Sequence, residues 1–445
     1  MKTNQFFWLF SALLLVNGCN LPTPDPGPDF PTTEFADIVF YNGTVITMNE
    51  AYPEGQAIAI KGKKILGVGT TLQALTTANR DTKLYDLKGK TIMPGIVDAH
   101  THVFNDRDRF GLDLNGAQEL LFENGITTMG NLFCTEEFVA EMRAFEPNLK
   151  VKTSLFLTKT FPCGEIQDSW YHEYPTTRTP GEVLRINGVK ITADGGSCGD
   201  MAVSEEFIPG TTGLGDLWHT QSEINEMVLE ADKAGYQVAI HAIGDRAIEQ
   251  AQNAIAYALD GRPNTLRHRI EHNSAIRPDL LPRYSEFGII PVIFGWKKIC
   301  DFYPRSPFYE LADFPYRTLI DYDPDLPVAW HGDDPYRGPV NPFIELHSMV
   351  TRTEVSETGE LCTPPAWLAA QTIPVATAIK LMTLNAAYSL FRETETGSLQ
   401  AGKYADLIVI SANPLSIDPR DIHDIEIQLT MANGEVVYNV PASGL

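Results

Sequence analysis

The sequence has 445 residues, enough to bury a large core, and its 43% hydrophobic and 20% charged residues are ordinary for a globular protein. A formal net charge of −23 argues against a nucleic-acid partner, because phosphate backbones are bound by basic surfaces. The acidity does not exclude an anionic substrate, since one buried arginine or metal ion can override the global field.

Residues 1–19 have the pattern of an export signal. Lys2 precedes an apolar run from Phe6 to Val16 that is short for a membrane span, and Val16-Asn17-Gly18-Cys19 resembles a bacterial lipobox. An ordinary signal peptide with a chance cysteine is the alternative. We predict that Cys19 is lipidated and anchors an exported bacterial lipoprotein to a membrane of the cell envelope, in the periplasm or at the cell surface. The Pro-rich residues 20–35 then form a tether.

The remaining five cysteines form no Cys-x-x-Cys pair. No disulfide framework or structural zinc cluster is therefore predicted. An exported protein could still form one or two disulfides, and the sequence leaves their pairing open.

Short strands and tight turns occupy both ends of the chain. Residues 37–41 lead through Asn42-Gly43, a strong hairpin signal, into a second strand, and more strands follow up to residue 90. Residues 398–445 show the same pattern, with another turn at Asn433-Gly434. We predict one small β-sandwich that combines residues 36–90 with residues 398–445.

Residues 91–397 instead alternate short apolar runs with helical patterns, such as those at 222–234 and 245–259. Eight βα units predict an α/β fold, a (β/α)8 barrel whose active site lies at the C-terminal ends of the strands. The eight candidate strands are 91–97, 127–130, 150–157, 188–192, 237–240, 267–271, 289–293 and 328–330.

Histidines stand at the ends of three of these strands. His100 and His102 follow an apolar run and face one side of a strand, because residues two apart share a face. His241 and His272 end the fifth and sixth strands. Each of these histidines taken alone could instead be a polar surface residue, a helix cap or a buried imidazole with a structural role. Together they predict a metal site, because imidazoles are common ligands of zinc and similar ions.

Lys190 is expected to face the barrel interior, because its neighbours Val189 and Ile191 share the opposite, apolar face. Burial lowers the pKa of an isolated lysine, and the neutral amine can react with carbon dioxide to give a carbamate that bridges metals. The alternative is a lysine that pairs with Asp194 or reaches solvent.

Asp333 follows the eighth strand, so barrel closure is expected to place it beside His100 and His102. There its carboxylate could take a proton from a metal-activated water. We interpret Asp334 as a turn residue before Pro335.

These segments together resemble the metal-dependent amidohydrolase superfamily, and more narrowly its third family, in the branch that contains N-substituted formamide deformylases. The chain departs from the branch in the short stretch between His102 and Thr127, in His331-Gly332-Asp333 where Gly-Ser-Asp is usual, and in residues 294–298. The matching segments are Pro94 to His102, Gly188 to Ile191 with Asp194-Gly195, His241 to Ala247, Arg269 to His272, Thr383 to Ala387 and Gly397 to Leu407.

The resemblance implies hydrolysis of a non-peptide C–N bond in a small amide or N-formyl amine. It implies one or two divalent ions, zinc foremost, which lower the pKa of a water toward about 7. Asp333 is the expected proton shuttle, and N6-carboxylation of Lys190 favours two ions. Ester or lactone hydrolysis and a non-catalytic surface binding lipoprotein are the alternatives. The substrate and the oligomeric state, a homo-oligomer included, stay open. The expected ligands are His100, His102, Lys190, His241, His272 and Asp333.

Overall fold

The computed structural model describes residues 30, 34–196, 198–206, 213–295, 313–336, 339–355, 360–441 and 444. The predicted signal peptide with Cys19, most of the tether at 20–35 and the loop residues 296–298 lie outside the described residues. Within the described part of the chain, no helix combines the length and the apolar content that crossing a bilayer requires.

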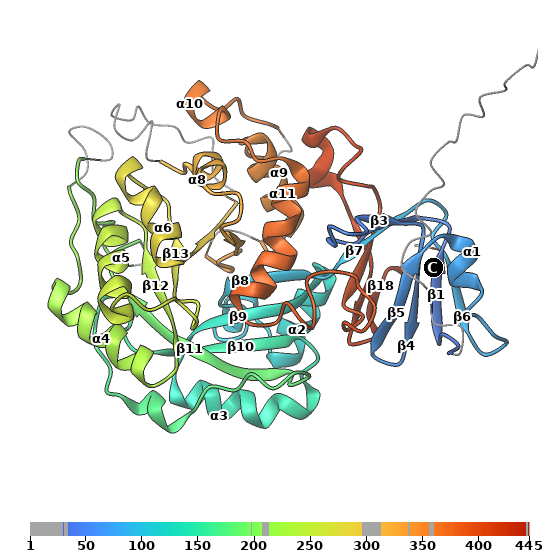
Figure 1. Cartoon of the computed structure of the whole chain (residues 1–445), viewed down its shortest axis with the longest axis horizontal. Coiled ribbons are helices and arrows are strands. Elements are labelled where there is room, and N and C mark those ends of the chain that lie inside the picture. The colour runs from blue at the N-terminus through green and yellow to red at the C-terminus, as the bar shows by residue number, and fades with distance from the viewer. Residues whose placement is uncertain are drawn as a thin grey trace, which may run out of the picture.

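Eight parallel strands form a barrel in which neighbours in the chain are neighbours in space (Figure 1). This arrangement confirms the predicted (β/α)8 fold. The strands are β8 (Ile96–Thr101), β9 (Ile126–Cys134), β10 (Lys152–Thr158), β11 (Leu184–Thr192), β12 (Gln237–Ala242), β13 (Arg269–His272), β14 (Ile290–Ile293) and β15 (Ala329–Trp330).

Backbone hydrogen bonds beyond the strand ends close the barrel between β15 and β8. The Asp333 N–H donates to the His100 carbonyl at 3.1 Å, and the His102 N–H donates to the Asp334 carbonyl at 2.8 Å. The closure therefore brings the segment after β15 beside the two histidines at the end of β8, as the sequence predicts.

Helices surround the barrel and bury one apolar face against it (Figure 1). In α4 (Gln221–Lys233), the Thr220 side chain accepts from the Glu223 N–H in a capping box, and Ile224 and Val228, four residues apart, are buried on one face. The other helices around the barrel are α2 (Leu114–Glu123), α3 (Glu136–Phe145), α5 (Asp245–Leu259), α6 (Leu281–Phe287), α8 (Tyr316–Tyr322), α9 (Pro342–Thr351), α10 (Ala366–Ala369), α11 (Val375–Lys380) and α12 (Ala386–Ser389).

Two further sheets lie beside the barrel and combine both ends of the chain (Figure 1). Phe40 and Ile58 from the N-terminal part share one core with Leu407 and Leu429 from the C-terminal part, which confirms the predicted β-sandwich. One sheet orders β5 (Lys64–Gly69), β4 (Ala57–Lys61), β1 (Ile38–Tyr41) and β6 (Lys83–Asp86), with α1 (Thr71–Leu75) nearby; the other orders β18 (Glu435–Asn439), β17 (Ile427–Ala432), β16 (Leu407–Ile410), β7 (Thr91–Pro94), β2 (Thr44–Ile46) and β3 (Glu54–Gly55).

The predicted strand at 91–97 is in fact two strands. Its first half, β7, pairs with β16 and β2 in the sandwich, and its second half, β8, starts the barrel. The chain passes from one sheet to the other at Gly95, where a Cβ atom would lie 2.3 Å from Thr127 Oγ1. Only glycine permits this close approach, and an apolar run alone does not show such a change of sheet.

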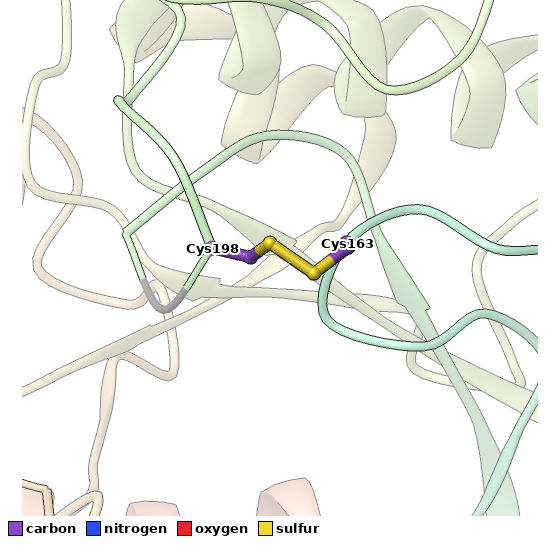
Figure 2. Close-up of a disulfide and its surroundings, with 2 residues drawn as sticks. All are labelled: Cys163 and Cys198. Carbon is purple, nitrogen blue, oxygen red and sulfur yellow. A yellow bond between two sulfur atoms is a disulfide. The ribbon is translucent and has the colours of Figure 1, made fainter.

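Two of the described cysteines, Cys163 and Cys198, form a disulfide with their Cα atoms 5.3 Å apart (Figure 2). Cys362 is disulfide-bonded too, and Cys134 is a buried free thiol. Cys163 and Cys198 are 35 positions apart in the sequence. Their pairing depends on the barrel, which places the loops after β10 and β11 side by side.

Candidate metal centre

A cavity of about 220 Å³ opens at the C-terminal ends of the barrel strands. The six side chains that the sequence predicts as site residues all line it, although they come from distant parts of the chain. The complete lining is His100, His102, Phe133, Pro162, Lys190, Gly196, His241, Ile243, His272, Asp333 and Tyr336.

Three of these side chains already have the spacing of metal ligands. The Nε2 atoms of His100 and His102 are 3.2 Å apart, and Asp333 Oδ1 lies 3.6 Å from the first and 3.5 Å from the second. When an ion binds ligand atoms tetrahedrally at 2.0–2.2 Å, those ligand atoms lie about 3.3–3.6 Å from one another. The group therefore fits a divalent ion of the size of zinc without rearrangement.

The outer hydrogen bonds of the histidines also fit a metal centre. His100 Nδ1 lies 2.8 Å from Glu271 Oε2, His102 Nδ1 lies 3.2 Å from the Leu132 carbonyl, and His241 Nε2 lies 2.9 Å from the Gly195 carbonyl. Since these oxygens accept, each histidine donates its N–H there and keeps the lone pair of the other nitrogen for an ion. Burial, together with the nearby charges of Lys190 and other histidines, holds the pKa of His100 well below its usual value, which favours the neutral ligand form.

Glu271 is a functional candidate that sequence reasoning missed. Its carboxylate is fully buried between His100 and Arg269, whose Nε lies 2.7 Å from Glu271 Oε1. Arg269 in turn donates to the Ala99 carbonyl at 2.8 Å. The sequence contains one indication of this role. Arg269 and Glu271 are two residues apart on β13, so their side chains share a face and can form an ion pair.

We expect Glu271→Gln to lower the affinity for Zn²⁺ about 10–100-fold, because a neutral amide polarises the His100 imidazole less. Competition with a chromophoric chelator measures this affinity. Glu395→Gln is the matched control, because Glu395 also pairs with a buried arginine, Arg185, at 2.6 Å outside the cavity lining. An equal loss of affinity in both variants would mean that the effect is a general one of breaking a buried ion pair.

Lys190 projects into the cavity, as expected, while Val189 and Ile191 pack in the apolar layer between barrel and helices. Its Nζ is fully buried and has no hydrogen-bond partner in the described part of the chain. Burial lowers the pKa of Lys190 to about 8, with Glu271 and Asp333 opposing the shift. A buried amine with a large neutral fraction fits the chemistry of carbamate formation.

His331 is a second residue to which sequence reasoning gave no role. It is fully buried, and its ring centroid lies 4.9 Å from that of His100 and 4.9 Å from that of His272. Ligand atoms of these three histidines lie within 4.8 Å of one another, so they form a second group that could hold an ion. The sequence contains one indication that His331 belongs to the site: it precedes the candidate ligand Asp333 by two residues.

Three non-glycine residues of the cavity lining have left-handed backbone conformations. The φ angles are 61° at Phe133, 74° at His272 and 55° at Asp333. Such conformations at non-glycine residues cost on the order of 1–3 kcal/mol each and cluster at functional sites. The barrel therefore stabilises a strained backbone at two candidate ligands.

Asp334 lies in a turn, as expected, but it is not an exposed turn residue. It is 2% exposed, and its carbonyl accepts the His102 N–H. A Cβ atom at Gly332 would lie 2.7 Å from Asp334 Oδ2 and 3.0 Å from Asp98 Oδ2, so the two carboxyl groups approach one spot. Burial and the Asp334 charge raise the pKa of Asp98 well above its usual value.

Comparison with known proteins finds relatives that match about half of this chain. The Bacillus subtilis protein YtcJ is 29% identical over 278 residues, 58% of this chain and 48% of that protein. The N-substituted formamide deformylase of Arthrobacter pascens is 25% identical over 233 residues, 51% of this chain and 41% of that enzyme. The chain thus spans less than half the length of either relative.

A solved structure and a family model also resemble this chain. An uncharacterized metal-dependent hydrolase from Pyrococcus furiosus has the same fold, with a TM-score of 0.69 at 20% identity over 85% of this chain and 100% of that chain. The model of the amidohydrolase family matches residues 106–438. Because this match extends over most of the chain, the protein belongs to the amidohydrolase family.

Proposed function

We propose that the protein is a metal-dependent hydrolase of a non-peptide C–N bond in a small amide or N-formyl amine. The observation that carries the proposal is the spacing of His100, His102 and Asp333, together with the outer hydrogen bonds that orient the histidines. Family membership and the named formamide deformylase support the choice of bond. The small cavity supports a small substrate.

The residues divide into those that hold the ion and those that act on the substrate. His100, His102, Lys190, His241, His272 and Asp333 would hold one or two divalent ions, zinc foremost, with Lys190 N6-carboxylated. Such ions lower the pKa of a water and polarise a carbonyl. Asp333, with Oδ1 toward the ion, would accept the proton of the attacking water on Oδ2 and deliver it to the departing nitrogen.

Two aromatic side chains shape the space around these residues. The Phe133 ring stacks on His102 at 5.6 Å, and the Tyr336 ring meets His102 edge-on at 5.2 Å. The Tyr336 hydroxyl donates to Asp106 Oδ2 at 2.5 Å, which fixes the ring. The two rings therefore cover two sides of the His102 imidazole within the cavity.

The test is a hydrolysis screen on protein of known metal content. The panel contains N-formyl amines, N-acyl amino acids, cyclic ureas, esters and lactones, each with and without prior removal of metal by EDTA. We expect cleavage of an N-formyl amine or amide that is lost on chelation and restored by Zn²⁺. Cleavage of esters or lactones alone would contradict the C–N assignment. Bound metal without any turnover would favour the surface binding protein.

We also propose that Cys19 is lipidated and anchors the protein to a membrane of the cell envelope, on the sequence pattern of residues 1–19. Several acyl chains anchor a protein stably, whereas one chain anchors it weakly. We expect mass spectrometry of the N-terminal peptide from a bacterial host to show lipid on Cys19, and the protein to sediment with membranes. Cys19→Ser is the control and should remain unmodified. A mature N-terminus without lipid would contradict the proposal.

A further inference from the structure

The Cys163–Cys198 disulfide joins the loops after β10 and β11 (Figure 2). Each loop contributes one residue to the cavity lining. Cys163 lies in the loop after β10 and is adjacent to Pro162, which lines the cavity. Cys198 lies in the loop after β11, two residues from Gly196, which lines it as well. Each end of the disulfide is therefore within two residues of a residue that lines the cavity.

Among the described residues, the hydrogen bonds that join the two loops lie near the strands. The Lys159 N–H donates to the Lys190 carbonyl at 2.9 Å, and the Thr192 N–H donates to Thr160 Oγ1 at 2.7 Å. Further out, the described bonds stay within one loop: Gly164 N–H to Phe161 carbonyl, and Gly196 N–H to Gly199 carbonyl. Beyond Thr160 and Thr192, the disulfide is thus the cross-link between the described parts of the two loops.

The two cysteines of the disulfide have similar neighbours in the chain. Each bonded cysteine is followed by a glycine with positive φ, 84° at Gly164 and 77° at Gly199. A Cβ atom would lie 2.6 Å from the Trp218 side chain at Gly164 and 3.1 Å from it at Gly199. Trp218 lies in the same β11–α4 segment as Cys198, so its packing on Gly164 adds a non-covalent contact between the two loops beside the disulfide.

The loop after β11 passes close to the candidate ligand His241. At Gly196, a Cβ atom would lie 2.4 Å from Ile243 Cδ1 and 3.7 Å from His241 Cε1. Residue Gly195 is anchored separately, because the neighbouring Asp194 carboxylate accepts from the N–H groups of Ala202, Ile243 and Gly244. Loss of the disulfide should therefore release Pro162 and Gly196 and leave the metal ligands in place.

We propose that the Cys163–Cys198 disulfide is a positioning cross-link that fixes the wall formed by Pro162 and Gly196 and so sets the size of group that fits beside His241. The proposal builds on the metal centre of the proposed function, but not on the bond that is hydrolysed. Cys163 is exposed and Cys198 is half-buried.

The test compares Cys163→Ser/Cys198→Ser with Cys134→Ser, which removes a free buried thiol outside the cavity lining. The first measurement is hydrogen–deuterium exchange of peptides that cover residues 159–169 and 193–203. We expect exchange about tenfold faster in both peptides of the double variant, because the cross-link no longer restrains local opening there. Metal content should stay at the wild-type level, and the Cys134→Ser variant should exchange as the wild type does.

The second measurement is the binding of two zinc-chelating probes of different size, acetohydroxamic and octanohydroxamic acid, by calorimetry to the zinc-loaded proteins. The ratio of their affinities should shift toward the larger probe by at least about fivefold in the double variant only. Unchanged exchange in both loops, or an unchanged affinity ratio, would overturn the inference. Because neither measurement needs turnover, a failed hydrolysis screen would contradict the proposed function and leave this result intact.

Discussion

Replacement of Asp333 by asparagine is expected to remove turnover while most of the metal stays bound. The amide keeps an oxygen where Asp333 Oδ1 now lies, 3.5–3.6 Å from the two Nε2 atoms, so the ligand group persists. An amide oxygen, however, is a poor base and cannot carry the proton to the leaving nitrogen. Loss of general acid–base help costs about 10²–10⁴-fold in rate. The measurements are kcat on the substrate that the screen identifies and bound metal by elemental analysis.

Asp334→Asn is the matched control for this experiment. The side chain is as large and as buried, but the structure connects the residue to His102 through its backbone carbonyl, which the substitution leaves unchanged. The Asp98 and Asp334 carboxyl groups approach one spot, so removal of one charge should not destabilise the turn. We expect kcat within a few-fold of the wild type. An inactive Asp334→Asn beside an active Asp333→Asn would show that the carboxylates are assigned the wrong way round.

The sequence predicts the architecture well where local patterns decide it. The helix at Asp245–Leu259 and seven of the eight strand positions rest on residue types that favour one backbone conformation or on an apolar period. The hairpin predicted at Asn42-Gly43 is wrong, because the turn there links β1 of one sheet to β2 of the other, and the two strands do not pair. The side-chain direction of Lys190 follows from alternation along β11, and the position of Asp333 follows from closure of the barrel. Once the barrel fold is assumed, these features can be predicted without knowing which distant residues touch.

The features that the sequence does not predict are those set by tertiary contacts. The change of sheet at Gly95 depends on the approach of Thr127, which lies on another strand. The role of Glu271 depends on His100, which lies 171 positions away in the sequence. The stacking of His331 on His100 and the pairing of Cys163 with Cys198 likewise require the closed barrel. Residue type alone does not distinguish such residues from ordinary buried polar groups.

Replacement of Lys190 by alanine is expected to remove metal and activity together. The buried Nζ has no hydrogen-bond partner in the described part of the chain, and three candidate ligands, His100, His241 and His272, line the same cavity. A carbamate on Lys190 would give this space a carboxylate, which suits a divalent ion better than an amine. Alanine removes it and leaves an empty space in its place. Elemental analysis and kcat of the purified variant measure the two losses.

Small carboxylic acids provide the sharper test of the carbamate. If a carboxylate is what the ion requires, formate, acetate or propionate should enter the vacated space in Lys190→Ala and restore part of both metal content and kcat, whereas the uncharged acetamide should not. Intact mass spectrometry of the wild type under native conditions should show the added mass of carbon dioxide, and this addition should be absent from the variant. A variant with full metal occupancy and normal turnover would reject any role of Lys190 in the centre. Loss of both without carboxylate rescue would instead assign Lys190 a packing role, because an amine that only fills space offers nothing that a carboxylate could replace.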